Sequence, residues 1–103
     1  MKCHSYNTFF ETIGNRTRLK ILELLMIKPM SVTEIHTKLG EEQSKISHNL
    51  KKLADCHFLD VKKEGKKRVY SINKDTILPL MNLVGKHVSS YCCKECKMKG
   101  VER

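Results

Sequence analysis

The chain has 103 residues, enough for one domain, and we expect no enzymatic activity because no nucleophile–base pair or glycine-rich phosphate loop is found. Its formal net charge of +9 and pI of about 9.5 indicate a polyanionic partner, most commonly nucleic acid. The N-terminal stretch MKCHSYNTFF lacks the apolar core of a signal peptide, and no apolar run approaches the roughly 20 residues that span a bilayer, so a cytoplasmic protein without a membrane partner is expected.

The first part of the chain is predicted to form short helices. Residues 5–13 carry an apolar face, and Asn15 can cap a second helix whose apolar residues recur at helical spacing. Pro29 stops that helix. Ser31 and Glu34 have the spacing of a capping box, in which the serine hydroxyl and the glutamate carboxylate each accept from the other residue's amide. A third helix is therefore predicted to begin here.

A fourth helix is predicted from Gln43 after only a short turn, and two strands follow it at residues 58–61 and 69–72. Helix, short turn and helix is the layout of the helix-turn-helix motif, whose second helix enters the major groove of DNA. Between Gln43 and Ile72 there are eight basic and three acidic side chains. This clustering on one helix and one hairpin favours a DNA-binding surface over a merely solvated one.

We expect DNA contacts from the polar face of this helix and from the lysine-rich hairpin. The expected contacts are made by Gln43, Ser44, Lys45, Ser47, His48, Asn49, Lys51, Lys62, Lys63, Lys66, Lys67 and Arg68. Side chains in the first helical turns can pair with base edges, whereas Lys51 is expected to touch a phosphate or nothing. The hairpin cations are expected at the backbone or the minor groove. For any single hairpin lysine, a solvated side chain is an equally good interpretation.

A last helix is predicted from Asp75 to about Cys96, with apolar side chains on one stripe. A domain this small would gain from dimerisation. Residues 97–103 are expected to form a flexible tail, so that the predicted domain covers residues 1–96.

Four segments in this order resemble the ArsR–SmtB family of winged helix-turn-helix repressors: IGNRTRLKILELL, SVTEIHTKLG, QSKISHNLKKL and FLDVKKEGKKRVYSI. The resemblance implies a mainly α fold with a small β-hairpin (α+β). It also implies double-stranded DNA as the partner, no cofactor required for DNA binding, and a homodimer joined by the first and last helices. The apolar faces of these two helices suit that role, and they can equally pack in the core of one chain.

Two positions depart from the family's pattern. Many members begin the recognition helix with a serine cap, whereas Glu42 precedes Gln43 here. The usual histidine of the S-x-H-L signature is replaced by Asn49, with His48 beside it. We therefore expect a base preference different from that of familiar family members.

The five cysteines are expected to be thiols or metal ligands rather than structural disulfides. Three of them form the segment CCKEC at the end of the last predicted helix: Cys92, Cys93 and Cys96. Soft thiolates favour arsenic(III), zinc, cadmium or lead, and a fourth ligand could come from Cys3 or His4. Cys56 is a less favoured ligand, since a small buried apolar role suits it better. The two inducer sites common in the family are not recognisable in this sequence.

The function predicted from these features is a homodimeric repressor that a thiophilic metal or metalloid releases from its operator. One alternative is a redox-switched regulator, with a disulfide between Cys93 and Cys96 or across the dimer. A second is a constitutive DNA-binding regulator. A third is a protein-interaction winged helix that does not bind DNA, which the polar helix face and the basic hairpin disfavour.

Overall fold

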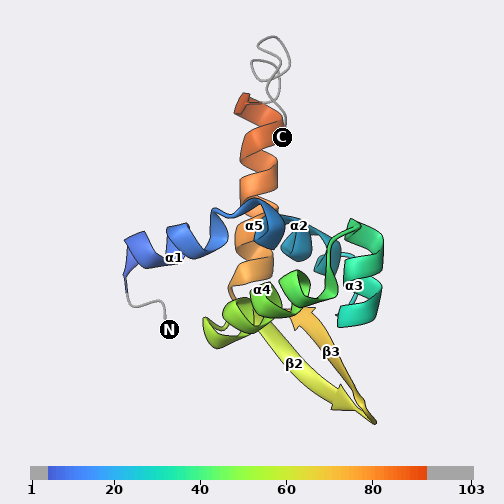
Figure 1. Ribbon diagram of the computed structural model, residues 1–103. Helices are drawn as coiled ribbons and strands as arrows, with labels where there is room; N and C mark the ends of the chain where they lie inside the picture. The colour runs from blue at the N-terminus through green and yellow to red at the C-terminus, as the bar shows by residue number, and fades with distance from the viewer. Residues whose placement is uncertain (1–4, 93–103) are drawn as a thin grey trace. The chain divides into compact units, whose positions relative to one another are not determined.

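The computed structural model describes residues 5–92, and side chains as far as Tyr91. The chain divides after Asn73 into two compact units. The first holds four helices and a three-stranded antiparallel sheet, and the second holds the last helix (Figure 1). This mainly α fold with a small β component was predicted.

Two capped helices begin the first unit. Helix α1 spans Tyr6–Ile13 and helix α2 spans Arg16–Leu25. The Asn15 side chain accepts a hydrogen bond of 3.1 Å from the Arg18 amide, so the predicted cap of α2 is confirmed. Phe9 of α1 packs against Phe58, with ring centroids 4.9 Å apart.

Strand β1, Met30–Ser31, is an element that sequence analysis did not predict. It pairs antiparallel with a later strand, with Met30 opposite Tyr70 and Ser31 opposite Val69. A two-residue strand has no periodicity to detect, because it depends on a partner about forty residues away.

Helices α3, Val32–Leu39, and α4, Gln43–Asp55, follow. The predicted capping box at the start of α3 is confirmed: the Glu34 amide donates to Ser31 Oγ at 3.3 Å and the Ser31 amide donates to Glu34 Oε1 at 3.1 Å. The latter bond, received by the carboxylate, holds the pKa of Glu34 below its ordinary value. Gly40 ends α3 in the left-handed conformation, with φ of 68°.

Strands β2, Leu59–Glu64, and β3, Lys67–Ile72, form the hairpin, and the strand order is β1-β3-β2. Both strands extend further toward the turn than predicted, because the ladder continues to the pair of Glu64 and Lys67. In Figure 1 the hairpin projects beyond α3 and α4.

The core of the first unit is contributed mainly by α2, α3 and α4. Its fully buried side chains include Ile21, Leu22, Ile35, Ile46, Leu50, Leu53 and Phe58. Each such side chain stabilises the fold by about 1.5–3 kcal/mol relative to an exposed one. Because α4 buries one complete face in this core, its opposite face is turned to solvent.

The second unit contains helix α5, Ile77–His87, followed by a π-helical turn at Val88–Cys92. The predicted helix was placed two residues too early, at Asp75. Its predicted end at Cys96 and the expected tail at 97–103 lie outside the described residues. No helix within residues 5–92 is long and apolar enough to span a membrane.

Candidate nucleic-acid interface

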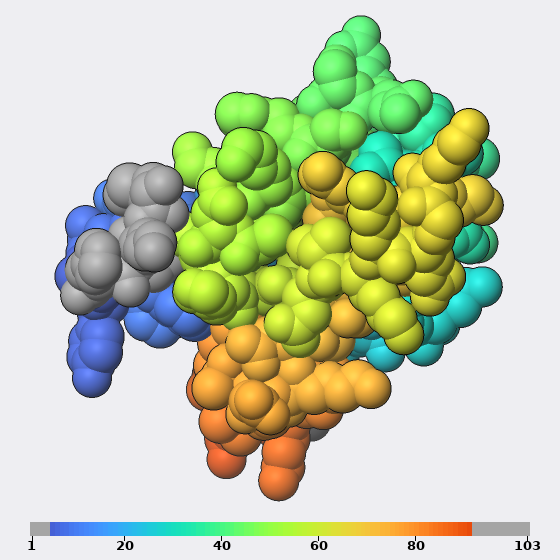
Figure 2. Space-filling model, turned by 90° about the horizontal axis from the view of Figure 1, so that it is seen from below, coloured from blue at the N-terminus to red at the C-terminus, as the bar shows by residue number. Residues whose placement is uncertain are grey.

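The outer face of α4 carries half of the side chains expected to contact DNA. Burial of Ile46, Leu50 and Leu53 fixes the rotation of the helix about its axis. The polar and basic side chains that remain exposed are Gln43, Ser44, Lys45, Ser47, His48, Lys51 and Lys52. Figure 2 shows α4 and the hairpin together on one face of the molecule. The fold therefore presents a helix suited to a groove next to a basic hairpin.

The placement expected for Asn49 on this outer face is wrong. Its side chain is only 6% exposed, and its Oδ1 accepts a hydrogen bond of 3.0 Å from Arg18 Nε. Its Nδ2 donates to the Lys45 carbonyl at 2.9 Å. Asn49 lies three residues after Ile46 and four before Leu53, so helical periodicity alone places it on the buried stripe.

Arg18 joins three elements through this contact. Its Nη1 donates to the Thr12 carbonyl in α1 at 2.7 Å, while its Nε donates to Asn49 in α4. The Arg18 backbone amide donates to the Asn15 cap of α2. Arg18 was not predicted as a contact, because nothing in the local sequence marks an arginine that bonds to a side chain 31 positions away.

The start of α4 has no side-chain cap. Glu42 occupies the N-cap position and makes no capping hydrogen bond, as its poor suitability for this position predicted. Glu41, one residue earlier, accepts a hydrogen bond of 3.1 Å from Lys45. Two carboxylates therefore stand at the end of α4 that is expected to approach bases.

The hairpin supplies most of the positive charge on this surface that no ion pair neutralises. Residues 62–68 contain five basic side chains and one acidic side chain, all of them exposed. The five are Lys62, Lys63, Lys66, Lys67 and Arg68. Within residues 5–92 none of them forms an ion pair, whereas on α4 Lys45 is paired with Glu41 and Lys51 with Asp55. Long-range attraction to DNA is therefore concentrated on the hairpin.

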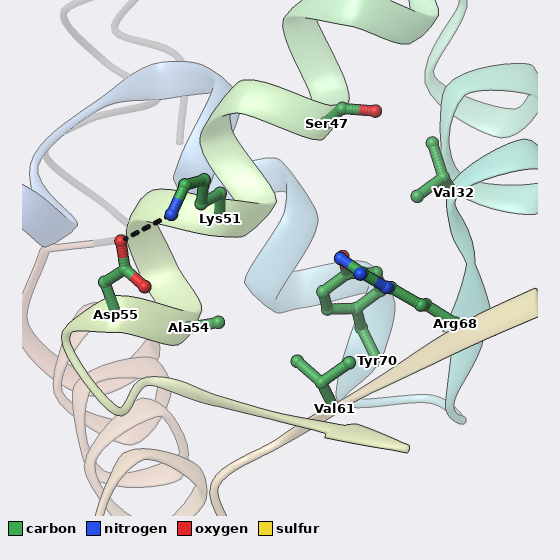
Figure 3. Close-up of a pocket in the computed structure, with 8 residues that line it drawn as sticks. All are labelled: Val32, Ser47, Lys51, Ala54, Asp55, Val61, Arg68 and Tyr70. Carbon is green, nitrogen blue, oxygen red and sulfur yellow. Dashed lines mark hydrogen bonds and ion pairs between the residues drawn. The ribbon is translucent and has the colours of Figure 1, made fainter. Parts of the chain in front are cut away.

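A pocket of about 570 Å³ lies between α4 and the hairpin, with one residue from the start of α3 (Figure 3). It is lined by Val32, Ser47, Lys51, Ala54, Asp55, Val61, Arg68 and Tyr70. Lys51 Nζ and Asp55 Oδ2 lie 3.3 Å apart at its edge. The pocket thus combines an apolar lining with charged groups from two different elements.

The cysteine cluster is largely beyond the described residues. Cys93 and Cys96 lie outside them, as do Cys3 and His4, and Cys92 is described only as the end of the π-helical turn. Cys56 is buried at the C-cap of α4, and no group of three potential metal ligands occurs among residues 5–92. The metal site therefore stays a prediction.

Helix-turn-helix, basic hairpin and third strand define a winged helix-turn-helix domain. The family model described as "Bacterial regulatory protein, arsR family" matches residues 15–61. An uncharacterised helix-turn-helix-type transcriptional regulator of Mycobacterium tuberculosis is 32% identical over 79 residues, which cover 76% of this chain and 69% of that protein. The chain belongs to the ArsR family.

Two further relatives carry functional names. The probable mercury resistance operon repressor of Streptomyces lividans is 26% identical, over 92% of this chain and 80% of the relative. The arsenical resistance operon repressor of Staphylococcus aureus is 25% identical, over 94% of this chain and 96% of the relative. Both matches extend over more than nine-tenths of this chain.

Solved structures are similar as well. The crystal structure of M. tuberculosis Rv0081 matches with a TM-score of 0.79 and 28% identity, covering 86% of this chain and 90% of that one. The homodimeric winged helix-turn-helix DNA-binding domain of Mb0332 from Mycobacterium bovis matches with a TM-score of 0.73 and 27% identity. This match covers 79% of this chain and 75% of that one. The winged fold predicted from the sequence is confirmed.

Proposed function

We propose that this protein is a homodimeric transcriptional repressor whose two copies of α4 and the hairpin bind double-stranded DNA. The observation that carries the proposal is the exposed polar face of α4 beside an unpaired basic hairpin. The hairpin cations bind the phosphate backbone of the DNA. The side chains in the first turns of α4 that contact base edges are Gln43, Ser44, Lys45, Ser47 and His48. Asn49 is not among the proposed contacts.

Exposed apolar side chains support a dimer joined by α1 and α5. On α1, Tyr6 and Phe10 are 88% and 60% exposed, and on α5 Leu83 is 64% exposed. Such side chains are stabilised by burial against a second copy. The solved relative from M. bovis is described as homodimeric, which supports a homodimer here.

The inducer we propose is a thiophilic metal or metalloid bound by the C-terminal cysteines. Cys92, Cys93 and Cys96 supply three thiolates, the number that suits arsenic(III), while Cys3 or His4 would complete a tetrahedral set for zinc. Cadmium and lead are the other thiophilic candidates. The names of the mercury and arsenical resistance repressors support this class of inducer. Cys56 is the least suitable ligand because it is buried.

The test is DNA binding with and without candidate inducers. Reduced protein is titrated onto DNA from upstream of its own gene, then arsenite, zinc, cadmium, lead, mercury(II) or diamide is added. We expect release by at least one metal or metalloid and no release from a variant with Cys92, Cys93 and Cys96 replaced by serine. Release by diamide alone would favour the redox alternative, and insensitivity to every agent would remove the sensing proposal.

A further inference from the structure

The pocket between α4 and the hairpin contains cations from two elements. Lys51 comes from α4 and Arg68 from β3, and Ser47 adds a hydroxyl on the same side of α4 as Lys51. Figure 3 shows the Arg68 side chain extending from the hairpin in the direction of α4 and overlapping the Tyr70 ring in this view. Arg68 therefore differs from the other hairpin cations, which do not line this pocket.

This inference rests on the proposed function, in which α4 and the hairpin bind DNA and the pocket between them lies next to the DNA backbone. A helix in the major groove and a hairpin reaching the adjacent minor groove lie on opposite sides of one phosphate strand. That strand must pass over the space between the two elements. We propose that the pocket is a phosphate seat, in which Lys51 and Arg68 bind the same backbone phosphate and Ser47 donates a hydrogen bond to it.

The carboxylate of Asp55 competes with that phosphate for Lys51. The Lys51–Asp55 pair is 3.3 Å long, and its side chains are 78% and 45% exposed. An ion pair this exposed is weak, so Lys51 exchanges the carboxylate for a phosphate at little cost. Asp55 itself then faces the phosphate with like charge. It therefore lowers affinity for any duplex, independently of sequence, and so favours sites where base contacts make up the difference.

The experiment measures binding of a labelled random-sequence duplex by fluorescence anisotropy between about 50 and 200 mM salt. We expect Lys51→Gln and Arg68→Gln each to weaken binding by about three- to tenfold. Each should make the negative slope of log affinity against log salt concentration shallower by up to about 0.9, the value for one phosphate. Asp55→Asn should instead strengthen binding by about threefold, because it removes a negative charge that repels the phosphate.

Coupling between the two cations is the decisive measurement. Because they share one phosphate, the double variant Lys51→Gln/Arg68→Gln should lose clearly less than the product of the two single losses. Lys51→Gln combined with Lys66→Gln at the hairpin tip should be multiplicative, since the two side chains do not share a site. Lys52→Gln is the matched control, because Lys52 is exposed on α4 but does not line the pocket.

Failure of the proposed function and failure of the shared phosphate seat would give different experimental results. Wild-type protein that binds neither this duplex nor DNA from upstream of its own gene would overturn the proposed function. Normal binding by wild-type protein, together with losses at Lys51 and Arg68 that multiply independently, would overturn the shared seat and leave DNA binding intact. Thermal unfolding of every variant excludes misfolding as the cause, and unchanged affinity in Asp55→Asn would overturn the competition.

Discussion

Asn49 is a polar residue whose side chain lies on the buried side of α4. Its amide group forms hydrogen bonds with Arg18 and with the Lys45 carbonyl, and both bonds lie in a partly buried setting. A buried polar group is stabilising only while its partners are in place, because the low-dielectric surroundings offer no water as a substitute. The role of Asn49 is thus to hold the recognition helix in position, and the consequence is measurable.

Asn49→Ala is expected to lower the free energy of unfolding by about 1–3 kcal/mol, because the Arg18 guanidinium loses an acceptor in a partly buried site. Urea denaturation measures the change. Ser47→Ala, two residues earlier on the exposed face, is the control and should stay within about 0.5 kcal/mol of the wild type. A stable Asn49→Ala protein with altered base preference would contradict the buried role.

Glu41, just before the start of α4, forms an ion pair of 3.1 Å with Lys45. Glu41→Gln should strengthen DNA binding by about threefold, because it removes a charge that repels phosphate and releases Lys45. Glu42→Gln removes the same charge one position later without releasing a lysine, so it serves as the comparison. Equal gains from both substitutions, measured by anisotropy, would show that general repulsion acts and the ion pair does not.

At the scale of elements, the helices of the first unit were predictable and β1 was not. Caps at Asn15 and Ser31 and apolar residues at helical spacing are local signals, so they appear in the sequence itself. Strand β1 exists through its pairing with β3, and the Arg18–Asn49 bond joins positions 31 apart. The same limit applies to the pocket, since neither α4 nor the hairpin alone indicates that Arg68 and Lys51 line one space.

Ser31 is both the last residue of strand β1 and the N-cap of helix α3. Ser31→Ala should lower the free energy of unfolding by about 1 kcal/mol through loss of the cap, while the backbone pairing of β1 is kept.

The pKa of Glu34 is lowered in the folded state, chiefly by the hydrogen bond from the Ser31 amide. Its stabilising contribution is therefore present above the ordinary glutamate pKa of about 4.3 and is lost as pH falls through the lower folded-state value.

Glu34→Gln isolates this contribution. The variant should show a weaker loss of stability than the wild type as the pH falls below about 4.3, because the group that gains a proton has been removed. Denaturant titrations at pH 7 and at several acidic values provide the comparison. An identical acid dependence in both proteins would contradict the assignment of the lowered pKa to this cap.

At the scale of the whole molecule, DNA reading and dimer formation are assigned to different surfaces. α4 and the hairpin form the proposed DNA face, whereas exposed apolar side chains lie on α1 and α5. The sequence predicted both surfaces, because exposed charge and apolar stripes are visible in composition and spacing. It could not distinguish an apolar stripe that packs within the chain from one left exposed: Phe9 packs on Phe58, while Phe10 is 60% exposed.

Separating the two surfaces leads to a prediction for the dimer. Phe10→Glu places a charge on the exposed face of α1 and should shift the protein toward monomer in sedimentation velocity, because burying an unpaired carboxylate is unfavourable. DNA binding should weaken by at least about tenfold at dilute protein concentrations, since one reading head then binds without the second. Ile27→Glu is the matched control: Ile27 is 75% exposed in the loop after α2, outside α1 and α5. If Ile27→Glu dissociated the protein and Phe10→Glu did not, the dimer would form through a different surface, and the spacing of its two recognition helices would have to be derived again from that interface.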